Sequence, residues 1–167
     1  LDVNLEETPV LCWRWRIDAP LASADLDTKA GDDYAARVYL TFTVPPDALG
    51  FATRTSLALA RSIWGSQVPD AAINYIWDNK HPAGTLKPNA YSDRVQMLVV
   101  ETGDAKAGRW VSERRHVADD FRRAFAGVPG RLTGLAIASD TDNTGESAHA
   151  GFADFHFVAD KEACATP

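Results

Sequence analysis

The chain has 167 residues, 46% of them hydrophobic, which suffices for one hydrophobic core and is short for two ordinary domains, so we expect a single domain over residues 1–167. Its formal net charge of −6 at pH 7 disfavours nucleic acid and anionic membranes as partners, because binders of phosphate surfaces usually carry a basic stripe. No apolar run reaches the about 20 residues that a membrane-spanning helix needs.

Alternation of apolar and polar side chains predicts strands along most of the chain. The first strand covers residues 11–17, in which every second side chain is apolar. This period of two is typical of a strand with one buried face. The same pattern predicts further strands, which makes about seven in all, over residues 36–42, 73–77, 94–99, 110–117, 132–139 and 151–158.

Two segments have helical spacing instead. Residues 54–64 place apolar side chains at helical intervals and stop before Gly65, a favourable residue at a helix end. Residues 118–125 carry acids first and arginines later, which suits the helix dipole. Residues 80–89 are expected to form a loop. Many strands with one or two short helices predict an all-β fold, a β-sandwich of jelly-roll type.

The two cysteines, Cys12 and Cys164, lie near opposite ends of the chain. Two alternatives stay open. A disulfide would close a very long loop, stabilise the fold by up to about 4–5 kcal/mol and imply an oxidising compartment. Otherwise both thiols are free, and the tail 160–167 is disordered unless Cys164 ties it down. Because the chain starts at Leu1 rather than Met, we expect that an upstream segment was removed, as in secreted proteins or trimmed chains.

Polar and aromatic side chains on the predicted strands suggest a ligand-binding sheet face, because strands hold side chains more precisely than loops do. Of the five tryptophans, Trp13 and Trp15 belong to an apolar face and are predicted to be buried, whereas two others stand at strand ends. The alternative is a solvated sheet face with cross-strand ion pairs. The predicted ligand-binding residues are Arg37, Asn74, Trp77, Arg94, Trp110 and Glu113.

Residues 140–145, with the sequence DTDNTG, resemble the opening of a calcium loop. Asp140, Asp142 and Asn143 would supply oxygen ligands to Ca²⁺. The twelfth position of such a loop is Gly151, where a bidentate Glu is required, so the segment is not an EF-hand. The alternative is a hairpin loop whose Asp and Asn side chains cap turns.

Signals for catalysis are weak. Glycoside hydrolysis needs two carboxylates across a cleft, and Glu101 or Glu113 together with Asp32 or Asp33 are the candidates. The four histidines lack the spacing of a zinc or copper site. A nucleophile elbow, a Walker loop and a dinucleotide fingerprint are all missing from the sequence, which disfavours acyl transfer, nucleotide hydrolysis and hydride transfer.

Several segments resemble the bacterial DUF3047 family, a domain of unknown function, and together they cover most of the chain. The most specific is KAGDDYAARVY at residues 29–39. The others are residues 13–15, 72–77, 136–145, the strand through Arg94 and Glu101, and the pair Arg122 and Arg123. The resemblance implies an exported, periplasmic protein and no established activity.

The end of the chain is similar to the closing hairpin of galactose-binding-like and carbohydrate-binding jelly rolls. The similarity covers residues 134–145 and 150–158, where Asp154 lies between apolar residues. This is a likeness of fold, and many unrelated functions use such sandwiches.

The sequence therefore predicts a periplasmic or secreted β-sandwich that binds a small polar ligand such as a saccharide on a sheet face. In this interpretation Arg37 and Arg94 receive oxygens, Asn74 and Glu113 fix orientation, and Trp77 or Trp110 stacks on the ligand. Two alternatives come from other classes. One is a glycan hydrolase or lyase, and the other is an envelope scaffold module without a small ligand.

Overall fold

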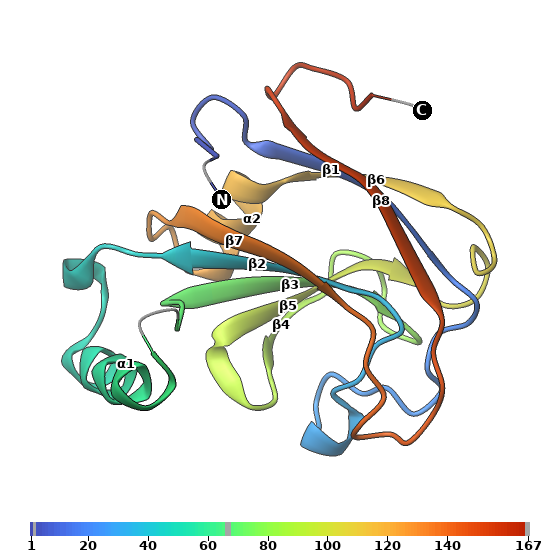
Figure 1. The fold of residues 1–167 in the computed structure, drawn as a ribbon, viewed down its shortest axis with the longest axis horizontal. Helices are drawn as coiled ribbons and strands as arrows, with labels where there is room; N and C mark the ends of the chain where they lie inside the picture. Colours follow the sequence, from blue (N-terminus) through green and yellow to red (C-terminus); the bar gives the residue numbers. More distant parts are fainter. Residues whose placement is uncertain (2, 66–67, 166–167) are drawn as a thin grey trace.

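The structure is a computed structural model that describes residues 1, 3–65 and 68–165. Its strands form two sheets that lie one over the other (Figure 1). We call the three-stranded one the small sheet and the five-stranded one the large sheet. The small sheet has the order β6 (Val111–His116), β1 (Val10–Ile17), β8 (Ala150–Val158). The large sheet has the order β4 (Leu86–Asn89), β5 (Ser92–Thr102), β3 (Ala71–Asp78), β2 (Arg37–Thr43), β7 (Arg131–Ala138).

The all-β sandwich predicted from the sequence is confirmed by these two sheets. The pairs of neighbouring strands run antiparallel, with the exception of β3 and β5, which run parallel. Jelly rolls are antiparallel throughout. The likeness to jelly rolls is therefore not supported at the level of topology.

Two α-helices flank the sandwich, α1 (Phe51–Trp64) and α2 (Val117–Ala124), together with two 3₁₀ turns, η1 (Lys29–Gly31) and η2 (Pro46–Ala48). Helix α1 ends at Gly65, whose φ of 91° is left-handed and suits glycine, as the sequence predicted. In α2 the ring of His116 caps the first turn by accepting the backbone N–H of Asp119.

The loop predicted at residues 80–89 is wrong in its second half. Residues Leu86–Asn89 form β4, which pairs antiparallel with the longer β5. The sequence Leu-Lys-Pro-Asn has no clear alternation, and Pro88 favours an edge strand. The strand exists because β5 supplies a hydrogen-bonding partner, which local sequence does not reveal.

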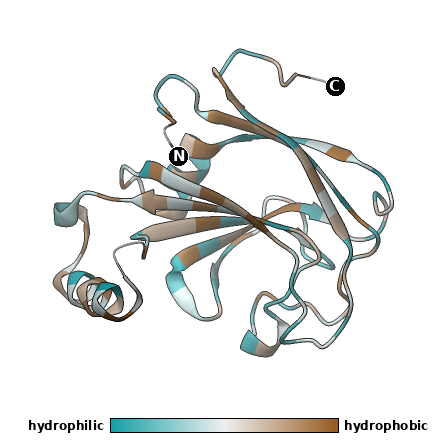
Figure 2. Ribbon diagram, viewed as in Figure 1, coloured by the Kyte–Doolittle hydropathy of each residue, from teal (hydrophilic) through white to brown (hydrophobic). Residues whose placement is uncertain are grey.

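Aromatic side chains from both sheets fill the space between them. Trp13 stacks on Tyr75 with ring centroids 5.6 Å apart, and Trp15 meets Trp77 at 5.7 Å. The burial predicted for Trp13 and Trp15 is confirmed. Trp77 is also buried, with 1% of its surface exposed, because its position in β3 places it on the core face. Figure 2 shows the hydrophobic residues concentrated in the strands, whereas loops and the β4–β5 hairpin are more hydrophilic.

Cys12 and Cys164 form a disulfide with their Cα atoms 5.7 Å apart. The bond joins β1 to the tail and closes a loop of 152 residues, which stabilises the fold by about 4–5 kcal/mol on the chain-entropy model. The tail is thereby tied down as far as the structure describes it, since residues 166–167 lie outside the described residues. Among the described helices, none is both long and apolar enough to cross a membrane.

Candidate functional site

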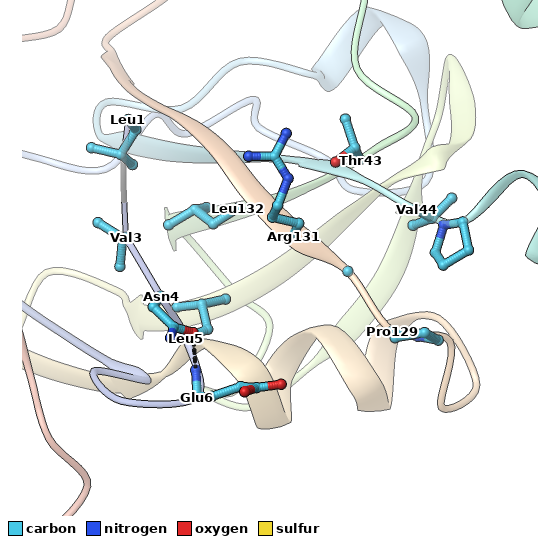
Figure 3. A pocket seen from close by; sticks show the side chains of 12 residues that line it. Leu1, Val3, Asn4, Leu5, Glu6, Thr43, Val44, Pro129, Arg131 and Leu132 are labelled. Atoms are coloured by element: carbon cyan, nitrogen blue, oxygen red, sulfur yellow. Dashed lines mark hydrogen bonds between the residues drawn. The ribbon is translucent and has the colours of Figure 1, made fainter.

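A hollow of about 660 Å³ lies between the N-terminal segment, the end of β2 and the start of β7 (Figure 3). Its walls carry aliphatic side chains together with Arg131 and Glu6. None of the six residues predicted to bind a ligand lines it. The site expected from the sequence must therefore be sought elsewhere.

The structure does not bring the six predicted ligand-binding residues into one hollow. Directly paired residues of neighbouring strands share a face of the sheet. In the large sheet Arg37 pairs with Ile76, and Tyr39 pairs with Asn74. Arg37 and Asn74 therefore lie on the outer face, away from the small sheet, whereas Trp77 points into the core.

Arg37 is the centre of a buried polar cluster and is only 2% exposed. Its Nε donates to Asp140 Oδ1 at 2.9 Å, and Nη1 donates to the Tyr39 hydroxyl at 2.9 Å. Nη2 donates to the backbone carbonyl of Asp32 and lies 3.3 Å from its carboxylate. The guanidinium also lies over the Tyr34 ring, 4.7 Å from the centroid. All three guanidinium nitrogens donate hydrogen bonds to other groups of the protein. Arg37 therefore holds the segments around Asp32 and Asp140 together and has no nitrogen left to bind a ligand.

Asp33 belongs to the same cluster and is fully buried. Its carboxylate accepts the backbone N–H groups of Asn143 and Thr144 at 2.9 and 2.6 Å. Burial alone would raise the pKa of the Asp33 carboxyl, but these hydrogen bonds outweigh it and hold the pKa below its usual value. These hydrogen bonds hold the segment just before β2 against the loop that follows β7.

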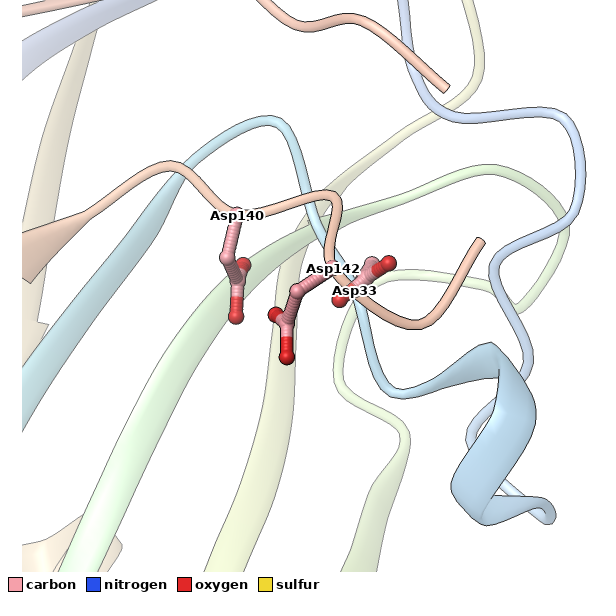
Figure 4. Close-up of side chains that lie close together, drawn as sticks. All are labelled: Asp33, Asp140 and Asp142. Carbon is pink, nitrogen blue, oxygen red and sulfur yellow. The ribbon is translucent and has the colours of Figure 1, made fainter. Parts of the chain in front are cut away.

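Asp33, Asp140 and Asp142 gather with carboxylate oxygens within 4.8 Å of one another (Figure 4). Three carboxylates suit Ca²⁺ in type. However, Asp33 already accepts three N–H donors, and Asp140 accepts Arg37, whose positive charge opposes a cation. Asn143 turns its amide nitrogen to Asp33 and its oxygen to the Tyr91 hydroxyl. The calcium site predicted on Asp140, Asp142 and Asn143 stays a prediction, and the geometry accounts for the cluster as a junction of loops.

Asn74 is 0% exposed, and neither its amide oxygen nor its amide nitrogen has a hydrogen-bond partner among the described residues. Its register neighbours are Tyr39 in β2 and Met97 in β5. A ligand on the surface cannot reach this amide without displacing the residues that bury it.

Trp77 and Arg94 are also held by the protein. Trp77 donates its indole N–H to the carbonyl of Gly103 at 2.9 Å. Arg94 donates to the carbonyl of Asp70 and lies over the Phe125 ring, 5.7 Å from the centroid. It lines a separate hollow of about 350 Å³ between α1 and the large sheet. The predicted stacking role of Trp77 is wrong, because the side chain is in the core.

Trp110 is the most exposed of the six predicted residues, with 46% of its surface exposed. It precedes β6, and its ring lies against Gly151 of β8, where an added Cβ would come within 2.9 Å of the indole. The Arg14 guanidinium lies 5.4 Å from the ring centroid. Trp110 borders a hollow of about 250 Å³ whose other lining residues are Arg16, Asp18, His149, Ala150 and Gly151.

The polar neighbours of Trp110 were not predicted from the sequence. In β1, Arg16 alternates with core residues. This pattern predicted that Arg16 lies on a solvated face, but it did not predict which residues would be its neighbours. Asp18 follows β1, and His149 precedes β8. Only the pairing of β1 with β8 brings them together, and this pairing joins segments more than a hundred residues apart.

Glu113 and Glu101 meet between the sheets. Trp15 donates its indole N–H to Glu113 at 3.0 Å, and Lys106 pairs with Glu101. Burial, together with the negative charge of Glu101, raises the pKa of the Glu113 carboxyl to about 8. Sequence reasoning missed Lys106, which lies in the loop between β5 and β6.

The pair does not have the geometry of a glycosidase. The hollow of about 470 Å³ that Glu113 borders is not lined by Glu101, whereas glycosidase carboxyls stand about 5–9 Å apart on a shared cleft with the sugar between them. Asp32, which contacts Arg37, lies on the opposite face of the large sheet. The predicted combination of Glu101 or Glu113 with Asp32 or Asp33 is therefore not assembled.

Comparison with family models identifies the family of the chain. A family model described as a protein of unknown function (DUF3047) matches residues 1–156. No curated protein and no solved structure matches the chain.

Proposed function

We propose that this chain, which belongs to the DUF3047 family, is an exported binding module that holds a saccharide ring against Trp110. The observation that carries the proposal is the exposed indole of Trp110 at the border of a polar hollow of about 250 Å³. The ligand-binding face is thus the outer face of the small sheet, and Trp110 is the one residue of the predicted set that contributes to it.

The chemistry around Trp110 suits a hydroxylated ring. An indole presents a flat apolar face that packs against the C–H face of a sugar, while polar groups at its edge bind hydroxyls. Arg16 and Asp18 form an exposed ion pair at 3.1 Å, so both can exchange their mutual contact for ligand hydroxyls. His149 supplies a further polar group on the same rim. These side chains offer donors and acceptors without a fixed charge excess.

The proposed location is the periplasm or the exterior of the cell. The disulfide between Cys12 and Cys164 supports it, because such bonds persist in oxidising compartments and are rare in the cytosol.

A panel of mono- and oligosaccharides tests the proposal through tryptophan fluorescence and thermal melting. We expect a cognate saccharide to quench or shift Trp110 emission and to raise the melting temperature. Trp110→Ala should abolish both responses. Phe51→Ala is the matched control, since Phe51 is another exposed aromatic residue, 80% exposed on α1. A saccharide response that survives in Trp110→Ala, or no response to any saccharide, would reject the site.

The same panel separates the two other functions. Product formation from a glycan that is lost in Glu113→Gln would support a hydrolase or lyase. If the panel shows neither binding nor turnover, the scaffold module is the remaining function.

A further inference from the structure

We propose that the hollow at the start of β7 binds a short apolar peptide in extended form, with the peptide carboxylate on Arg131 and its ammonium on Glu6. This site is separate from the hollow beside Trp110, with which it shares no lining residue.

The size and walls of the hollow fit a small apolar ligand. Its volume of about 660 Å³ lies within the range of typical small-molecule sites, about 300–1,000 Å³. Aliphatic walls come from the N-terminal segment, the end of β2 and the start of β7 (Figure 3). The side chains that provide them are Leu1, Val3, Leu5, Val44 and Leu132.

Two opposite charges border these walls. Arg131 and Glu6 are both exposed, and neither forms an ion pair with another residue of the described chain. Figure 3 shows the Arg131 guanidinium and the Glu6 carboxylate at separate places around the hollow, with Leu132 and Leu5 between them. A guanidinium binds a carboxylate through two parallel hydrogen bonds. One positive and one negative group around an apolar floor select a zwitterion over a fatty acid or a neutral hydrocarbon.

The backbone of β7 favours a peptide among zwitterions. As the last strand of the large sheet, β7 directs alternate N–H and C=O groups away from β2. An extended peptide pairs with such groups by strand addition.

The other edge strands carry charges or proline within the strand, which discourage pairing, whereas the one charged residue of β7 is Arg131 at its first position. From Leu132 to Ala138 it has no charged residue and no proline. By contrast β4 contains Lys87 and Pro88, β6 contains Glu113 and two Arg residues, and β8 contains Asp154.

Trileucine and its capped forms test the assignment by isothermal titration calorimetry on the intact protein. We expect trileucine to bind, and its amide, which lacks the carboxylate, to bind about tenfold more weakly, as for loss of a charge-assisted hydrogen bond. In Arg131→Gln the acid and the amide should bind equally. In the same way, N-acetylation should weaken binding to the wild type but not to Glu6→Gln. Arg131→Gln thus removes only the effect of amidating the peptide carboxylate, and Glu6→Gln removes only the effect of acetylating its ammonium.

Arg54→Gln is the matched control, because Arg54 is an exposed arginine of α1 with no ion pair in the described part of the chain, and it should leave trileucine binding unchanged. No binding of trileucine, or equal binding of free and capped peptides to the wild type, would overturn the proposal. Decanoate that binds as tightly as trileucine and depends on Arg131 alone would assign the hollow to an aliphatic anion instead. Trp110→Ala should retain peptide binding, so failure of the saccharide site and failure of this one are distinguishable.

Discussion

Two groups of ionisable side chains lie at the same end of the large sheet, on opposite faces. Arg37 pairs with Ile76 on the outer face, whereas Glu101 aligns with Trp77, the next residue of β3, on the core face. In the first group a buried cation is surrounded by carboxylates. In the second, Glu113 faces the like charge of Glu101.

The difference shows how burial acts on matched and unmatched charges. Around Arg37, opposite charges and hydrogen bonds offset much of the loss of water, although burial still raises the pKa of the Asp140 carboxyl, and the cluster holds loops together. Around Glu113 a second negative charge adds to the cost of burial, and the carboxyl keeps its proton up to a pKa of about 8. We therefore expect the first group to fix the fold and the second to make its stability depend on pH.

Removing the cation of the first group should have the largest effect. In Arg37→Met the carboxylates of Asp32 and Asp140 lose their partner in a buried site, and we expect a loss of about 3–5 kcal/mol in the free energy of unfolding. Urea denaturation followed by circular dichroism measures it. Arg14→Met is the control, because Arg14 and Asp154 form a partly exposed ion pair, and its loss should be at most about 1 kcal/mol. Equal losses in the two variants would mean that Arg37 is not a special junction.

Raising the pH should destabilise the protein through Glu113. The pKa of about 8 in the folded protein lies above the ordinary glutamate value of 4.5, so the folded state binds the extra proton between these values. This contribution is fully present below pH 4.5 and is lost as the pH rises through 8, with a slope of at most about 1.4 kcal/mol per pH unit. Chemical denaturation at several pH values between 5 and 9 measures the trend.

Glu113→Gln is the test of that assignment. The neutral amide cannot ionise against Glu101, so the variant should lose most of the decline in stability toward alkaline pH. An unchanged pH profile in Glu113→Gln would place the titrating group elsewhere.

The smallest expected effect comes from Asn74, whose buried amide has no partner among the described residues. Asn74→Leu has a similar shape and removes the cost of an unpaired polar group, so we expect a gain of about 1–2 kcal/mol in the free energy of unfolding. Melting and urea titration measure it. A destabilised variant would show that the amide has a bound partner such as an ordered water.

The secondary structure was largely predictable because it depends on neighbours along the chain. Alternating side chains identified β1, β2 and β3, and Gly65 marked the end of α1. The strand β4 was missed because its only signal is its partner β5. Cys12 and Cys164 suggested a disulfide, but two free thiols fitted the sequence equally well until β1 and the tail were placed together.

The candidate sites were predictable only in part. Trp77 and Trp110 were both predicted to be accessible aromatic residues. Trp110 is exposed, whereas Trp77 is buried. The two look alike in sequence because each stands at a strand end. Exposure is decided by which face of the sheet is covered, and this depends on strands far away in the chain.

The sequence by itself determined the strands other than β4, the short helices, the burial of Trp13 and Trp15 and the possibility of a disulfide, because each follows from local periodicity or from a residue type. Tertiary structure alone decided that Arg37 is enclosed by Asp32 and Asp140, and that Arg16, Asp18 and His149 meet beside Trp110. The physical reason is that charges and hydrogen bonds act over a few ångströms in space, and pairing between distant strands sets which side chains come that close.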